Sequence, residues 1–215
     1  MKIRTISQLS DFLSAELSWR RKELTILKGQ VENNSLANNA NLVFLRGGVA
    51  LLYAHFEGYI KKASTAYLEF VRMQRLLYKD LSNHFFSIAL KQKFLTQYSS
   101  KAYSDFMVVA EFVRSNMATS SDFNHRNVID TESNLSSIIF KEIVLSLGLD
   151  YATFEGLEKL IDTKLLQKRN HIAHGEFTDI DIEDYRILHE RIIAVLDNFR
   201  TQIENSAVLM SYKKE

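Results

Sequence analysis

No proline occurs in the 215 residues of this chain, and only seven residues are glycine. Both residue types interrupt helices, proline because it lacks a backbone N–H and glycine because its backbone is so free. Residues that favour helices, such as Ala, Leu, Glu, Lys, Arg, Gln and Met, fill the long stretches between the few breaks. The sequence therefore predicts an all-α fold and, at this length, one domain over residues 1–215.

Three segments carry apolar residues at steps of three and four, as one face of a helix requires. The first helix is predicted to follow a cap at Thr5 or Ser7 and to end near Gln30. A long second helix is predicted for about residues 42–72. The last helix is predicted to start among the acidic residues 179–183, which favour a helix N-terminus.

The middle of the chain is less regular. Residues 73–118 are predicted to be helical and rich in Phe and Tyr that serve a core or a dimer interface, with one candidate break at Ser99 and Ser100. Residues 119–135 are the most polar and least periodic, which predicts an excursion or mobile loop and raises the hypothesis of a lid over the functional site. A short helix is predicted for about residues 136–147.

Charge and cysteine content limit the possible functions. Lys and Arg number 27 against 26 Asp and Glu, so the broad basic field of a non-specific nucleic-acid binder is missing and any RNA contact must be local. The absence of Cys removes disulfides and thiolate sites and favours a cytoplasmic location. No stretch is apolar enough to predict a signal peptide or a membrane span.

The stretch LLQKRNHIAHG holds the densest set of polar groups suited to chemistry. It is predicted to be a helix that Asp162 or Thr163 caps and that ends at Gly175. On such a helix Asn170 and His174 lie about 40° apart, whereas Arg169 lies about 140° from His174.

The chemistry of these side chains suits cleavage of an RNA phosphodiester. A histidine in the last turn of a helix sits at the negative end of the helix dipole, which favours its protonated form and lets His174 donate a proton near neutral pH. The guanidinium of Arg169 is always charged and can bridge two phosphate oxygens. Cleavage needs proton removal from the 2′-hydroxyl, stabilisation of the phosphorane-like transition state and proton delivery to the leaving oxygen.

The run RNHIAHG resembles the R-x4-6-H signature of HEPN domains, with four residues between the Arg and the His. Upstream, LRGGVALLYAHFEGYIKKA is similar to the long second helix of HEPN proteins found beside bacterial defence and toxin genes. The resemblance implies an up-and-down helical bundle, here with additional helices. It also implies a homodimer whose two motifs face one cleft and cleave RNA without metal or cofactor, leaving 2′,3′-cyclic phosphate.

Carried over to this chain, the resemblance makes Arg169 and His174 catalytic and lets Asn170 orient them or the phosphate. Glu57 on the second helix is expected to pair with Arg169. A toxin or phage-defence effector is implied, with an antitoxin or defence-system partner protein that holds it in check. Some toxin relatives carry a Tyr two residues after the motif His that a partner modifies, but this chain has Glu176 there.

Other residues near the motif have two interpretations. His171 is a possible second acid or base, or a partly buried histidine bonded to a carbonyl. Lys164 and Lys168 are candidates to bind flanking RNA phosphates, or are solvated charges. His-x-x-His without a carboxylate or Cys partner is a weak metal signal, so no metal is predicted.

The function itself also has alternatives. A catalytically inactive HEPN module that binds RNA, nucleotide or a partner protein uses the same polar residues, and a purely structural helical bundle needs none of them. The RNA target and the partner's identity do not follow from the sequence.

Overall fold

The computed structural model describes residues 2–32, 38–95, 103–123, 128–129, 131 and 134–214. The α-helices in these residues are α1 (Ile6–Val31), α2 (Asn38–Met73), α3 (Asn83–Leu95), α4 (Tyr103–Asn116), α5 (Ser137–Ser146), α6 (Lys168–Ala173) and α7 (Ile182–Val208). Two 3-10 turns, η1 (Tyr78–Asp80) and η2 (Tyr151–Phe154), and a π-helix, η3 (Leu160–Gln167), complete the order. The described residues contain no β-strand, so the all-α prediction is confirmed.

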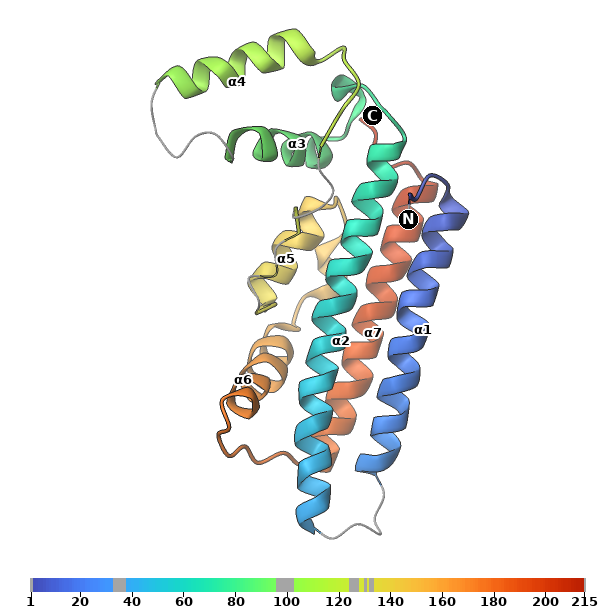
Figure 1. The fold of residues 1–215 in the computed structure, drawn as a ribbon, viewed down its shortest axis with the longest axis vertical. Helices are drawn as coiled ribbons and strands as arrows, with labels where there is room; N and C mark the ends of the chain where they lie inside the picture. Colours follow the sequence, from blue (N-terminus) through green and yellow to red (C-terminus); the bar gives the residue numbers. More distant parts are fainter. Residues whose placement is uncertain are drawn as a thin grey trace.

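Three long helices form the centre of the molecule. α1, α2 and α7 lie side by side along the long axis, with α1 running opposite to the other two (Figure 1). Thr5 caps α1 as predicted, because its side chain accepts from the Gln8 N–H while the Gln8 side chain accepts from the Thr5 N–H. The predicted bounds of α1 and α2 agree with the observed ones to within four residues.

The core lies between these three helices and is built from their apolar stripes. Gly48 of α2 leaves room for Tyr185 of α7, because a Cβ there would lie 2.8 Å from Cε2 of the Tyr185 ring. The fully buried residues that line the three helices include Leu13, Leu17, Leu24, Val49, Leu52, Phe56, Tyr59, Leu196, Phe199 and Ile203.

Shorter elements cover one side of this bundle. The motif segment, η3 and α6, packs against α2, and α5 lies further along the same side (Figure 1). Phe140 of α5 is fully buried and its ring centroid lies 5.8 Å from that of Phe56 and 6.0 Å from that of Phe199. An aromatic cluster therefore joins α5 to α2 and α7.

Helices α3 and α4 extend away from one end of the bundle (Figure 1). None of the α4 side chains is buried, and Tyr103, Phe106 and Met107 are among the most exposed apolar residues described. The Phe112 ring, 5.3 Å from the Tyr78 ring between centroids, joins α4 to η1. Tyr103 and Phe106 therefore serve no core within one chain, and their predicted alternative role in a dimer interface stays a prediction; the predicted break at residues 99–100 lies outside the described residues.

The described parts of the excursion, residues 119–135, form no helix. Although the segment is the most polar of the chain, most of its described apolar side chains are buried. Phe123, Ile129 and Leu135 are buried in the core. The predicted loop is therefore anchored by apolar side chains at several points. The short helix predicted to follow it is confirmed as α5, with Ser136 as its N-cap.

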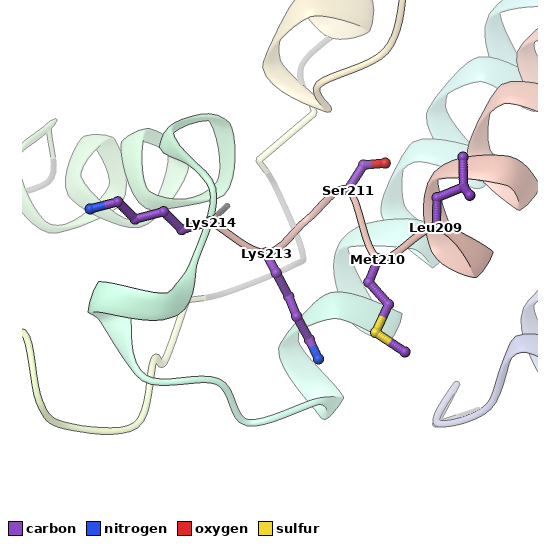
Figure 2. A pocket seen from close by; sticks show the side chains of 5 residues that line it. All are labelled: Leu209, Met210, Ser211, Lys213 and Lys214. Carbon is purple, nitrogen blue, oxygen red and sulfur yellow. The ribbon is translucent and has the colours of Figure 1, made fainter.

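The C-terminal turn bounds a hollow of about 480 Å³. Figure 2 shows the side chains that line it, Leu209, Met210, Ser211, Lys213 and Lys214. The hollow lies at the far end of α7 from the motif segment (Figure 1). Since a helix of 27 residues is about 40 Å long, the hollow is no part of a site around the motif.

Two buried histidines predict how the stability of the fold depends on pH. Burial lowers the pKa of His55, which the Glu23 carboxylate 2.8 Å away offsets only in part, and burial together with the charge of Lys28 lowers the pKa of His189. A histidine whose pKa is lower in the folded than in the unfolded state stabilises the fold above the unfolded value of about 6.5. That contribution is lost as the pH falls from about 6.5 through the folded pKa.

We therefore expect the urea concentration at the midpoint of unfolding to decrease as the pH is lowered from 7.5 to 5.5. His189→Gln removes one of the two titrating groups and should reduce the fall, whatever it does to stability at pH 7.5. Equal falls in the wild type and in the His55→Gln and His189→Gln variants would show that other groups set the pH dependence.

Candidate functional site

The motif lies on a helix that begins in a way the sequence did not predict. Residue Lys159 precedes the π-helix without any side-chain cap, so the predicted cap by Asp162 or Thr163 is wrong. Asp162 lies inside the helix, and its carboxylate accepts hydrogen bonds from the Ser137 N–H (2.7 Å) and hydroxyl (2.5 Å). Ser137 is the first residue of α5, where the N–H has no partner within its own helix. Asp162 thus stabilises the start of α5 and joins it to the motif segment.

The predicted stop at the end of the motif is confirmed. Gly175 has a φ of +76°, the left-handed conformation that glycine adopts without strain. Its N–H donates to the Ile172 carbonyl (3.1 Å), and the Glu176 N–H donates to the His171 carbonyl (2.8 Å). This is a Schellman motif, which fixes the backbone on both sides of His174.

Arg169 points from α6 towards α2. Its guanidinium carbon lies 4.0 Å from the centroid of the Tyr53 ring, within the range of a cation–π contact. One of its nitrogens, Nη2, lies 3.9 Å from Oε2 of Glu57. Tyr53 and Glu57 are one helical turn apart on α2, so the two together hold the guanidinium from that helix.

Tyr53 is buried and takes part in this contact as a neutral phenol. Burial, together with the charge and hydrogen bond of Glu57, raises the pKa of Tyr53 to about 12. Its hydroxyl oxygen accepts a hydrogen bond from the Leu135 N–H at 2.6 Å. A phenol with this pKa stays protonated at neutral pH and is not a general base.

Glu57 has a further partner from the excursion. The Thr131 hydroxyl donates a hydrogen bond to Oε1 of Glu57 at 2.5 Å, while Oε2 faces Arg169. Sequence reasoning missed Thr131 and Leu135, because nothing in an aperiodic segment indicates which residues meet another helix. Thr131 and Leu135 thus lie beside the two side chains that contact Arg169. No contact between the described residues of the excursion and His174 is observed, and the lid over the site stays a hypothesis.

His174 lies at the C-terminal end of α6 and is exposed to solvent. Its backbone N–H donates to the Asn170 carbonyl at 3.0 Å, and the Asn170 side chain is partly buried. Arg169 lies near the start of α6 and His174 caps its C-terminus; at 100° per residue, positions five apart are about 140° apart around a helix axis. No hydrogen bond or ion pair between their side chains is found in the described residues, so one chain presents the two groups in different directions.

The two lysines near the motif are both engaged by one carboxylate of α7. Lys164 Nζ lies 3.0 Å and Lys168 Nζ 3.8 Å from Oδ2 of Asp184. The hydrogen bond from Lys164 lowers the pKa of Asp184, which keeps that carboxylate charged. An RNA phosphate at these lysines must therefore compete with Asp184.

The remaining histidine, His171, is partly exposed, and its Nε2 lies 3.8 Å from Oε2 of Glu176. No group of three or more His, Asp or Glu side chains that could hold a metal ion occurs in the described residues. Nor does any helix among them combine the length and apolarity needed to cross a membrane.

Comparisons with known proteins bear on the family. The search of curated proteins and the search of solved structures each found no match. The model of the HEPN_MAE_28990-like HEPN family matches residues 9–212. This range includes both the second helix and the motif segment that the sequence analysis singled out, and it covers nearly the whole chain. The chain therefore belongs to the HEPN family.

Proposed function

We propose that this chain is a metal-independent endoribonuclease of HEPN type. The observation that carries the proposal is the placement of Arg169, held between Tyr53 and Glu57, on the same short helix whose end exposes His174. A fixed guanidinium supplies charge for the transition state, and an exposed imidazole supplies proton transfer. HEPN domains are often ribonucleases, which agrees with this chemistry.

In the proposed reaction the 2′-hydroxyl of one nucleotide attacks the adjacent phosphorus. The bond from O2′ to phosphorus forms while the bond from phosphorus to O5′ breaks, giving a 2′,3′-cyclic phosphate and a 5′-hydroxyl. His174 takes the proton from the 2′-hydroxyl or delivers one to the leaving oxygen, and Arg169 stabilises the negative charge on the phosphate oxygens. Asn170 fixes the geometry of these groups.

A homodimer completes the proposed site. Since helix positions five apart are about 140° apart, Arg169 and the C-cap His174 of one chain lie on different sides of the helix axis, and a second copy facing the first can place its own motif opposite and contribute the complementary groups. The cell role that fits such an activity is a cytoplasmic toxin or phage-defence effector that an antitoxin or defence-system protein restrains.

The test is RNA cleavage by the purified protein in excess EDTA. We expect fragments ending in 2′,3′-cyclic phosphate, and no cleavage of the same oligonucleotides made with 2′-deoxyribose, because the nucleophile is then missing. Light scattering on the same sample should give the mass of two chains. Loss of cleavage in EDTA, or cleavage of the deoxy substrate, would contradict the mechanism. RNA binding without cleavage would favour the inactive binding module.

A further inference from the structure

The end of the excursion is hydrogen-bonded to α2, the helix whose side chains contact Arg169. Thr131 donates to the Glu57 carboxylate and the Leu135 N–H donates to the Tyr53 hydroxyl, at 2.5 and 2.6 Å. Both acceptors contact Arg169 directly. Two attachment points of the excursion thus reach two side chains that contact the guanidinium.

A third attachment reaches η3, the π-helix that leads into α6. Ser137, two residues after Leu135, donates twice to Asp162 in the motif segment. Thr131 and Leu135 are therefore bonded to α2, and Ser137 is bonded to η3, which leads directly into α6 and Arg169. We call the described residues Thr131, Leu135 and Ser137 the strap.

Glu57 connects the strap to the charged guanidinium of Arg169. Hydrogen bonds to an ionised carboxylate are about twice as strong as those between neutral groups, and the 2.5 Å separation from Thr131 is at the short end of their range. The Arg169 Nη2 lies at 3.9 Å from the other carboxylate oxygen, outside hydrogen-bonding distance. Thr131 thus fixes the carboxylate more closely than Arg169 does.

We infer that Thr131 is a positioning residue for Arg169 and that it acts through Glu57. Thr131 itself is buried at 2% exposure, so it contacts no substrate. It sets which way the Glu57 carboxylate faces, and Glu57 sets where the guanidinium rests on the Tyr53 ring. The inference rests on the proposed function only for its consequence in catalysis.

The first test compares Thr131→Val, which keeps the shape and removes the hydroxyl, with Thr131→Ser, which keeps the hydroxyl. We expect Thr131→Val to lower kcat for RNA cleavage about 10- to 100-fold with little change in KM, because a guanidinium displaced by a fraction of an ångström stabilises the transition state less well. Thr131→Ser should restore most of kcat. Thr201→Val, on the exposed face of α7, is the matched control and should leave kcat unchanged.

A double-mutant cycle separates positioning from general loss of structure. If Thr131 acts through Glu57, Thr131→Val should lower kcat no further once Glu57→Ala is present. Effects of the two substitutions that multiply would overturn the inference. So would a Thr131→Ser variant as slow as Thr131→Val.

The second test needs no activity. The side-chain Nε–Hε signal of Arg169 in an NMR spectrum, assigned by its loss in Arg169→Lys, should shift in Thr131→Val and return in Thr131→Ser. An unmoved signal would overturn the inference even if the enzyme is active. A shifted signal in a protein that cleaves no RNA would leave the positioning role standing and remove the proposed function instead.

Discussion

Replacing His174 by alanine is expected to slow RNA cleavage by about 100- to 10,000-fold, the usual contribution of a side chain that transfers protons in the transition state. The fold should not change, because the Schellman motif around His174 uses only backbone groups and the side chain is exposed. Single-turnover rates measured in EDTA, with circular dichroism as the check on folding, give the comparison.

Arg169→Ala should have an effect of similar size in the same assay, about 100- to 1,000-fold, as expected for removal of a preorganised charge. Arg169→Lys should recover little, because an ammonium offers neither the two-pronged contact with phosphate nor a planar group to lie on the Tyr53 ring.

His84→Ala is the control for the His174 substitution, since His84 is an exposed histidine on α3. A fully active His174→Ala variant would show that the residue serves only as the end of a helix.

The largest expected loss of stability follows from Phe140→Ala, at about 3–5 kcal/mol of the free energy of unfolding. Phe140 is fully buried, and its ring lies 5.1 Å from that of Phe154 in addition to its contacts with Phe56 and Phe199. Alanine leaves a cavity among rings from three elements that cannot all close on it. Phe140→Leu should cost less, because most of the volume is kept.

Urea unfolding of Phe140→Ala and of Ile138→Ala tests this expectation. Ile138 lies on the same helix but is 74% exposed, so its replacement should change stability by less than about 0.5 kcal/mol. A Phe140→Ala variant no less stable than Ile138→Ala would mean that α5 contributes little to the core. Since Ser137 of α5 is bonded to the motif segment, the wild-type position of α5 also matters for the site.

The long helices could be predicted because their signals are local. The absence of proline, the apolar period and the caps Thr5 and Gly175 all lie within the segments they define. Arg169 and His174 were recognisable for the same reason, since the motif is a run of neighbouring residues. The approach of Glu57 to Arg169 came from a resemblance rather than from the pattern, and the structure brings the two side chains to 3.9 Å.

What the sequence could not reveal depends on contacts between distant segments. Asp is a residue type that commonly caps the start of its own helix, yet the Asp162 carboxylate accepts from the first residue of α5. Tertiary packing, and not the local sequence, determines this partner. Thr131 lies 74 residues from Glu57, in a segment without period. In α4 the outward direction of Tyr103 and Phe106 follows from how the helix docks, and an apolar pattern alone does not distinguish a covered face from an uncovered one.

The exposed position of α4 has a consequence for how this protein can change. A helix that buries none of its side chains adds little to the cooperative stability of the bundle, so its own opening costs less free energy than global unfolding. By contrast, α2, whose Tyr53 contacts Arg169, contributes many side chains to the buried core. Substitutions on the outer face of α4 are therefore nearly neutral for the bundle, and the surface it presents can diverge between relatives while the chemistry of the motif is retained.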